Sequence, residues 1–340
     1  MQNKFATKRN IPKSAYKGAK ALRVTIAAAL AVGISTSMAA CAPQESNVIT
    51  ISTHDSFVIS KAQLASFKKQ TGLTVKVVKA GDAGALTNKL VLTQGAPIAD
   101  AFFGIDNSLL GLAQSKNVVA SYQDIDFGDV CLNYDKYWFA AHNLAAPTSW
   151  KQIAQPTYRG LTVLTDPATS SPGLAFLATT VAQFGDAGWQ GFWKQLKNNE
   201  VKIASGWEDA YFTDFSGSSG KGAYPIVLSY STSPAYEIRK NGEPQTASLN
   251  DGCFRQTEYA GVLTNAKNPA GAAKLVQFLR SDEFQSGIPD SMYVYPAVTS
   301  TNLPTDWAKW GKPANTVVKN VLTSDQIRKA LLSQWAEIFG

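Results

Sequence analysis

Short strand-like runs alternate with helix-like runs along this chain, and this alternation limits its possible folds more than any other feature. Residues 48–53 form the first apolar run, and the capping-box pattern at Ser60 opens a helix that ends at Gly72. Apolar residues alternate through 73–77, and 98–105 is a third strand-like run. This order predicts an α/β lobe with helices packed on a sheet.

The same alternation returns later in the chain. Residues 161–164 and 226–228 predict strands, and Pro172 suits the first turn of a helix. Asn268 and Ser324 begin two further predicted helices. The helix that Ser324 opens is expected to bury Ile327, Leu331, Trp335 and Ile338.

Residues 48–340 exceed what one hydrophobic core usually organises, so we expect two lobes. The sequence contains no clear linker in this range, which indicates that the chain crosses between the lobes more than once. We predict that lobe 1 is formed by residues 48–130 and 258–340, and lobe 2 by residues 131–257.

Two cysteines lie in these lobes. In an exported protein an isolated pair favours one disulfide, here between Cys131 and Cys253. Crossing strands near 130–134 and 254–260 would place the two side by side and pin the hinge.

Residues 1–40 have the layout of a secretory signal peptide. They carry seven Lys and Arg and no acid, and an apolar run at 24–32 leads to Met38-Ala39-Ala40-Cys41. This ending resembles a lipobox, which predicts lipidation of Cys41 and a tether at 41–47. The alternative is a transmembrane anchor, but the run is shorter than the roughly 20 residues that a bilayer needs.

Removing the signal peptide changes the charge of the protein. The chain has 32 Lys and Arg and 25 Asp and Glu, so losing seven basic residues leaves 25 of each sign. A neutral mature protein offers no basic face, so we expect no nucleic-acid partner. The sequence also contains no motif for a metal or a cofactor, and we expect neither.

Polar and aromatic residues gather where the predicted strands end, which is where α/β proteins bind ligands. The candidate site residues are Asp55, Ser56, Asp82, Asp106, Ser170, Ser171, Trp207, Tyr211, Tyr230, Tyr236 and Tyr293. Carboxylates and aromatic rings together suit a planar cationic ligand, because the rings supply cation–π contacts and the carboxylates balance the positive charge. The alternative is that the rings pack in the core and the two serines only cap a helix.

An enzyme is poorly supported by the sequence. It has two histidines, His54 and His142, and no GxSxG elbow. His54 cannot form a triad with the adjacent Asp55 and Ser56, because successive side chains on a strand point to opposite faces.

Six segments carry a resemblance to a known family. They are THDSF at 53–57, GIDNSLL at 104–110, DPATSSPGL at 166–174, GWEDAY at 206–211, LSYSTSPAY at 228–236, and IP at 288–289 ahead of YP at 295–296. In this order they resemble the thiamine-binding periplasmic proteins of ABC importers, over nearly the whole mature chain.

The resemblance implies a type II periplasmic-binding-protein-like fold, with two α/β lobes joined by hinge strands and the ligand in the cleft. It implies a monomeric, lipid-anchored, extracytoplasmic receptor that captures thiamine or a thiamine phosphate and delivers it to ABC permease and ATPase subunits. By motif, Trp207 and Tyr236 would line the thiamine rings and Asp82 would meet the aminopyrimidine. Ser170 or Ser171 would lie near the hydroxyethyl or phosphate end.

Two positions depart from the family pattern, which often has Tyr in place of His54 and Trp in place of Tyr293. The changed stacking area predicts an altered affinity or preference. Two other ligands stay open, namely another cationic heteroaromatic compound and ferric iron. Iron receptors of this superfamily commonly place two adjacent tyrosines on the metal, whereas Tyr230 and Tyr236 are six residues apart.

Overall fold

The computed structural model describes residues 46–219 and 221–340. The predicted signal peptide, the lipidation site at Cys41 and most of the tether lie outside these residues. Within the described part of the chain, none of the helices has the length and apolar composition that crossing a bilayer requires.

Strands and helices follow one another in the predicted order. The strands are β1 (Val48–Thr53), β2 (Thr74–Lys79), β3 (Ala101–Asp106), β4 (Val119–Asp135), β5 (Thr162–Thr165), β6 (Lys202–Ala204), β7 (Ile226–Tyr230), β8 (Thr246–Leu263) and β9 (Tyr295–Pro296). The α-helices are α1 (Lys61–Thr71), α2 (Ala83–Leu92), α3 (Leu110–Ser115), α4 (Lys136–Ala141), α5 (Ser171–Asn198), α6 (Pro269–Leu279), α7 (Asp282–Gln285), α8 (Ile288–Met292), α9 (Thr305–Trp310) and α10 (Asp325–Phe339). Shorter turns are η1 (Trp150–Ala154), η2 (Pro156–Tyr158), η4 (Ser233–Ala235) and a π-helix, η3 (Asp209–Asp214).

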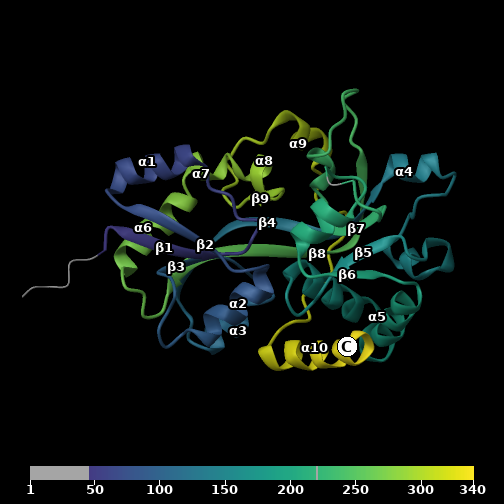
Figure 1. The fold of residues 1–340 in the computed structure, drawn as a ribbon, viewed down its shortest axis with the longest axis horizontal. Coiled ribbons are helices and arrows are strands. Elements are labelled where there is room, and N and C mark those ends of the chain that lie inside the picture. The colour runs from purple at the N-terminus through teal and green to yellow at the C-terminus, as the bar shows by residue number, and fades with distance from the viewer. Residues whose placement is uncertain (1–45, 220) are drawn as a thin grey trace, which may run out of the picture. The chain divides into compact units, whose positions relative to one another are not determined.

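Two long antiparallel strands, β4 and β8, form the middle of a sheet with the order β2-β1-β3-β8-β4-β7-β5-β6. On the β8 side, the sheet continues with β3, β1 and β2, which are parallel to one another. On the β4 side, it continues with β7, β5 and β6, which are also parallel to one another. Helices cover both faces of the sheet (Figure 1). This arrangement confirms the predicted two-lobed type II fold, with β4 and β8 as the hinge strands.

Local sequence explains where the helices begin and end. Ser60 and Gln63 form the predicted capping box at α1, and Gly72 ends that helix in the left-handed conformation. Pro172 lies in the first turn of α5, as predicted. Inside α5, Gly185 has φ 66° and bends the helix.

The burial predicted for the last helix was wrong at one position. Leu331, Trp335 and Ile338 are buried, but Ile327 is 39% exposed, and Arg328 is buried in its place. The Arg328 guanidinium forms an ion pair with Asp325 one turn earlier, which satisfies its charge.

The predicted disulfide between Cys131 and Cys253 is present, with the two Cα atoms 4.9 Å apart. It lies at an irregularity of the hinge, where the pairing of β4 with β8 shifts from Val130 opposite Phe254 to Leu132 opposite Leu249. The extra residues of β8 leave the ladder there, and the disulfide ties their end back to β4.

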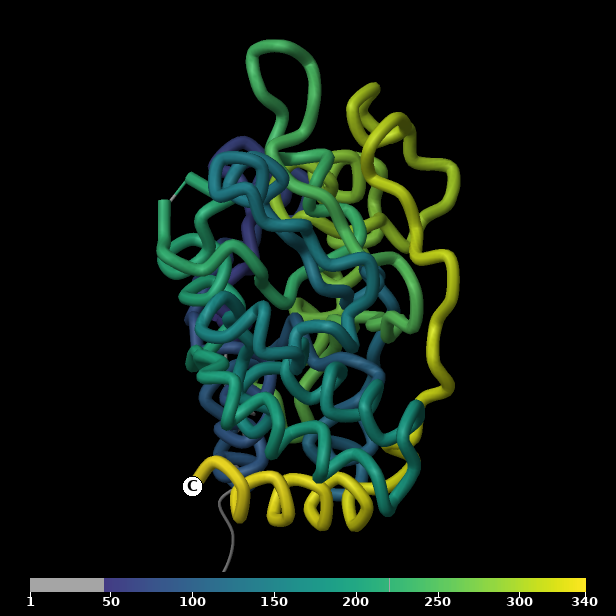
Figure 2. The backbone as a smooth tube through the Cα atoms, turned by 90° about the vertical axis from the view of Figure 1, so that its right-hand side faces the viewer, coloured from purple at the N-terminus to yellow at the C-terminus, as the bar shows by residue number. Residues whose placement is uncertain are grey.

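The C-terminal segment runs from α9 along one side of the molecule to α10, in yellow in Figure 2. On the way, Val317 forms a parallel bridge with Cys253 beside the hinge. Helix α10 then packs on α5, where Trp335 and Trp193 meet edge to face with ring centroids 5.9 Å apart. The lobe boundaries remain a prediction, and this packing leads us to expect α10 to move with lobe 2.

Candidate functional site

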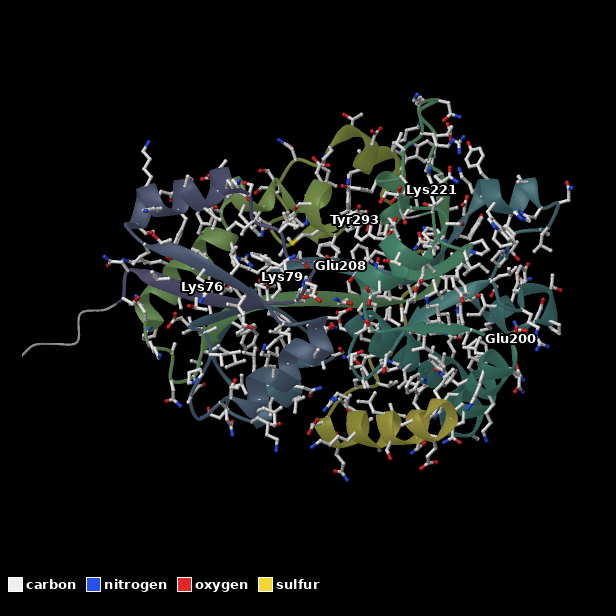
Figure 3. All side chains as sticks on the ribbon, viewed as in Figure 1. Lys76, Lys79, Glu200, Glu208, Lys221 and Tyr293 are labelled. Atoms are coloured by element: carbon white, nitrogen blue, oxygen red, sulfur yellow. A yellow bond between two sulfur atoms is a disulfide. The ribbon has the colours of Figure 1, made fainter. Side chains whose placement is uncertain are left out.

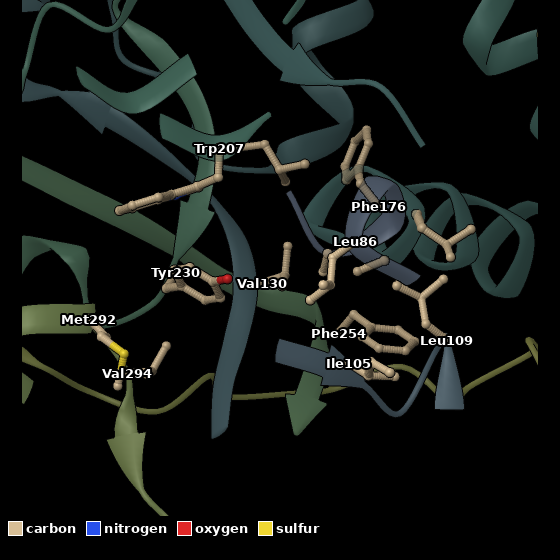
Figure 4. Close-up of a cluster of buried hydrophobic side chains, with 14 of the residues drawn as sticks. Leu86, Ile105, Leu109, Val130, Phe176, Trp207, Tyr230, Phe254, Met292 and Val294 are labelled. Atoms are coloured by element: carbon tan, nitrogen blue, oxygen red, sulfur yellow. The ribbon is translucent and has the colours of Figure 1, made fainter. Parts of the chain in front are cut away.

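Loops from both halves of the sheet surround a narrow cavity. The cavity also has residues from the starts of α2 and α5, from the ends of β7 and α8 and from the strand β8, and the loops that line it follow β1 and β6. The lining residues are His54, Ser56, Asp82, Ser171, Pro172, Trp207, Tyr230, Glu258, Met292 and Val294. Figure 4 shows Trp207, Tyr230, Met292 and Val294 at one end of the buried apolar cluster that backs this cavity.

A second cavity of about 230 Å³ adjoins the first and shares Ser56, Asp82 and Trp207 with it. One wall carries Asp55, Ser56, Gly81, Asp82 and Ala85, and the opposite wall carries Thr169, Ser205, Gly206, Trp207, Glu208 and Asp209. The two walls belong to the two predicted lobes, so the cavities together form the cleft between them.

Asp82 connects the two walls directly. Its Oδ2 accepts a hydrogen bond of 2.8 Å from the Trp207 backbone N–H, and its Oδ1 accepts one of 2.6 Å from the N–H of Ala83, at the start of α2. Burial raises the pKa of Asp82, and the two N–H donors oppose that rise. One carboxyl therefore begins a helix in one lobe and holds a loop of the other.

Aromatic side chains cluster around Trp207. Its ring stacks on Tyr211 with centroids 5.0 Å apart and meets Tyr230 at 6.0 Å and Tyr293 at 5.5 Å. Tyr236 lies against Tyr293 with centroids 3.8 Å apart, and it is 46% exposed whereas the other rings are buried. Figure 3 labels Tyr293 near the middle of the molecule.

Hydrogen bonds fix two rings of this cluster. The indole Nε1–H of Trp207 donates to Ser229 Oγ at 2.9 Å, and the hydroxyl of Tyr211 donates to Glu237 Oε1 at 3.1 Å. Burial raises the pKa of Glu237 to about 7. The rings are thus held rigidly, as a stacking platform for a planar ligand requires.

His54 contacts Glu258 in the narrow cavity, with 3.4 Å between Nε2 and Oε2. The Ser56 N–H donates to Nδ1 at 3.1 Å, which places the ring proton on Nε2. Burial lowers the pKa of His54, but Glu258, Asp82 and Asp55 together raise it, so the net shift is upward. Protonation of Nδ1 would remove the hydrogen bond from Ser56 and strengthen the attraction to Glu258. Gly104 has φ 98°, and a Cβ there would lie 1.9 Å from the imidazole Cδ2.

One of the other predicted residues, Asp55, lines a cavity of the cleft, and five line neither cavity, namely Asp106, Ser170, Tyr211, Tyr236 and Tyr293. Asp55 lines the second cavity, where its Oδ1 accepts from the Gly81 N–H at 3.1 Å. Ser170 is buried behind Ser171 and donates to Thr165 Oγ1 at 3.0 Å. Asp106 is fully buried, and burial raises its pKa to about 6.

The sequence predicted half of the residues that line the narrow cavity and missed the other half. Ser56, Asp82, Ser171, Trp207 and Tyr230 line the narrow cavity as expected. The residues missed are His54, Pro172, Glu258, Met292 and Val294. Glu258 had a usable signal, because it occupies a buried position in the alternation of Phe254, Gln256, Glu258 and Ala260 along β8.

A larger polar groove of about 450 Å³ lies elsewhere, beside the disulfide. It is lined by Thr148, Ser149, Trp150, Lys151, Gln183, Ser248, Leu249, Asn250, Asp251, Gly252, Asn315 and Thr316. Asp251 is its one acid, and its one ring, Trp150, is buried. The smaller cleft, with several acids and rings, is the better candidate. Within residues 46–219 and 221–340 no group of three or more His, Cys, Asp or Glu suits a metal ion.

Comparison with known proteins gives a consistent result. Residues 113–323 match the family described as bacterial extracellular solute-binding protein. The thiamine-binding periplasmic protein of Escherichia coli (strain K12) is 31% identical over 312 residues, which are 85% of this chain and 92% of that protein. The thiamine-binding periplasmic protein of Brucella suis biovar 1 is 30% identical over 320 residues, which are 86% of this chain and 92% of that protein.

A solved periplasmic thiamin binding protein superposes with a TM-score of 0.74 and 25% identity, covering 86% of this chain and 96% of its own. This family consists of transport proteins that bind solutes outside the cytoplasm. The chain belongs to the bacterial extracellular solute-binding proteins and, among them, to the family of the thiamine-binding periplasmic proteins.

Proposed function

We propose that this protein binds thiamine or a thiamine phosphate outside the cytoplasm and delivers it to the permease and ATPase subunits of an ABC importer. The two lobes close around the ligand, and the ligand undergoes no reaction. It bridges the two walls of the cleft and so stabilises the closed form. The protein acts as a monomeric receptor and not as an enzyme, and a lipid on Cys41 holds it at the membrane.

The observation that carries this proposal is the meeting of acids and rings in one cleft. Asp82 and Glu258 lie beside the rings of Trp207 and Tyr230. Thiamine combines a permanently charged thiazolium ring with a flat aminopyrimidine ring, so it needs both negative groups and stacking faces. The similarity to proteins that are named for thiamine binding supports the same ligand.

The helix start at Ser171 supports the phosphorylated forms as additional ligands. Ser171 is the first residue of α5 and lines the narrow cavity. The N–H groups at a helix N-terminus favour anions, so the phosphate of a thiamine phosphate would lie here. The helix is continuous from Ser171 to the bend at Gly185, and its dipole acts mainly within the first turn, where Ser171 lies.

Calorimetric titration with thiamine tests the proposal. The full-length chain would be expressed with its own leader, purified in its exported form, and unfolded and refolded with its disulfide intact to strip ligand. We expect saturable one-to-one binding in the micromolar range or tighter. Titration with an aminopyrimidine that lacks the thiazolium ring is the control for the cationic part, and it should bind more weakly.

The alternatives give different results in the same experiment. Ferric iron binding without thiamine binding would identify an iron receptor, and binding of neither would refute the proposed ligand. If thiamine and the bare aminopyrimidine bind with equal affinity, the carboxylates of the cleft do not interact with the positive charge of the thiazolium ring.

A further inference from the structure

Three carboxyl groups form a row beneath the cleft, and of these Glu258 lines the narrow cavity. Glu258 on β8 is directly opposite Asp106 on β3 and directly opposite Asp126 on β4. Residues opposite each other in antiparallel strands point to the same face, with their Cβ atoms about 5 Å apart. Asp106 and Asp126 are fully buried and Glu258 is 7% exposed. Three ionised carboxylates at this spacing and burial would repel one another strongly.

The hydrogen bonds of the row are unevenly distributed. Glu258 lies against His54 Nε2 at 3.4 Å and accepts from Gln256 Nε2 at 3.1 Å. Asp106 Oδ1 accepts from the Ser108 N–H at 2.7 Å, but its Oδ2 is buried without a partner. Both carboxyl oxygens of Asp126 are buried without a partner among the described residues. Hydrogen-bond donors therefore stabilise a negative charge on Glu258, whereas no donor in the described part of the chain would stabilise one on Asp126.

Few positive groups face the row. The titratable groups around it are His54 and Asp55 after β1, Asp82 at the start of α2, Tyr230 on β7, and the three acids themselves. The ion pairs that Lys and Arg form within the described residues go to other acids, such as Asp129, Asp124 and Asp214. The row thus has more carboxyls than positive groups to balance them.

A buried carboxyl without a donor is neutralised by a proton, because a bare charge there would cost too much. Burial and the adjacent Glu258 both raise the pKa of Asp126 well above its usual value. For Glu258, burial opposes ionisation, but His54 and its other hydrogen-bond partners hold its pKa below the usual value. Of these two facing carboxyls, Asp126 is therefore the one that favours the proton, and Glu258 is the one that favours the charge.

We propose that a cationic ligand displaces the proton that Asp126 holds against Glu258, so that binding and proton release are coupled. This inference rests on the proposed function, because it needs a cation in the cleft. The ligand brings one positive charge to Glu258, the Asp126 carboxyl ionises, and the proton passes to the buffer. The net charge of the cleft stays the same, since one positive charge replaces another.

Calorimetry on the full-length protein at pH 7 tests this, with thiamine titrated in PIPES and in Tris, whose ionisation enthalpies differ. We expect the observed heat to differ between the buffers by the amount for about one released proton, with Kd falling about tenfold per unit rise in pH. The aminopyrimidine of thiamine is neutral at pH 7 and can only take up a proton. Release therefore identifies a group of the protein.

The variant Asp126→Asn should still bind thiamine but lose the buffer dependence, because the amide donates to Glu258 without a titrating proton. The control is Asp124→Asn, on the same strand, whose carboxylate is half-exposed and paired with Arg280. It should behave like the wild type. Thermal unfolding of each variant checks the fold, and the wild-type measurement stands without them.

Three results would contradict different parts of the proposal. Binding with no buffer dependence in the wild type would overturn the coupling and leave the proposed function intact. Release that persists in Asp126→Asn but vanishes in His54→Gln would assign the proton to the imidazole and overturn the role of Asp126. No heat with thiamine in either buffer would refute the proposed function, and the coupling with it.

Discussion

Tyr236 offers the sharpest test of the candidate site because its contribution to binding can be separated from its contribution to folding. Its ring is 46% exposed and lies on Tyr293 with centroids 3.8 Å apart. Truncation to Ala loses this pair, worth about 0.5 to 1.5 kcal/mol in stability. A stacking anchor for a ligand typically contributes about 1 to 3 kcal/mol to binding, so Kd should rise roughly 5- to 150-fold. Trp207 is less suitable, since it is buried and its truncation would also weaken the fold.

The assay compares calorimetric Kd values for thiamine with urea unfolding of the same samples. The matched control is Tyr122→Ala, because Tyr122 is 38% exposed and pairs with another tyrosine, Tyr259, at 5.2 Å, outside the ring cluster around Trp207 to which Tyr236 belongs. Tyr122→Ala should lose similar stability and keep its affinity. If the two variants bind thiamine equally well, Tyr236 does not contact the bound ligand and its proposed role in binding is wrong.

Three further predictions concern Glu237, the disulfide and Gly104. Glu237, with its pKa raised from 4.5 to about 7 by burial, stabilises the fold fully below pH 4.5 and loses this contribution as pH rises through 7. Glu237→Gln, which keeps an acceptor for Tyr211, should flatten this part of a plot of melting temperature against pH, and an unchanged slope would contradict the assignment. Replacing Cys131 and Cys253 by Ser opens a loop that spans 122 residues, which chain entropy puts at about 5 kcal/mol of unfolding free energy, and equal urea midpoints would refute this. Gly104→Ala should weaken thiamine binding by displacing the adjacent imidazole, and wild-type affinity would show that the ring can move freely.

Local signals in the sequence predicted the helices and strands well because each signal acts over a few residues. The capping box at Ser60 and the cap at Asn268 each satisfy backbone N–H groups of their own helix, and Pro172 lacks an N–H that would have no partner in the first turn of α5. Asp82 was expected at a strand end and lies in the cleft for that reason, since it is the N-cap of α2. Ligand sites at strand ends follow from local order alone.

The parts that depend on strand pairing could not be predicted in the same way. Glu258 and Asp126 lie in the interior of long strands, far from any loop, and only the register of β8 against β4 brings them together. His54 was judged by its sequence neighbours, Asp55 and Ser56, whereas its partner in space is 204 residues away. The exposure of Ile327 likewise reflects how α10 sits on α5, which a helical period alone does not determine.

The order of strands in the sheet has a consequence for how the protein is made. β3 pairs with β8 on one side, so the sheet that starts with β1 cannot be completed until residues beyond Thr246 are available. Contacts between segments so far apart in sequence form slowly and late. A chain that leaves the ribosome N-terminus first therefore stays without a finished N-terminal half until most of it has been synthesised. The other half of the sheet has no such delay, because β7, β5 and β6 join it through β4, and β8 is the strand that finally connects the two halves.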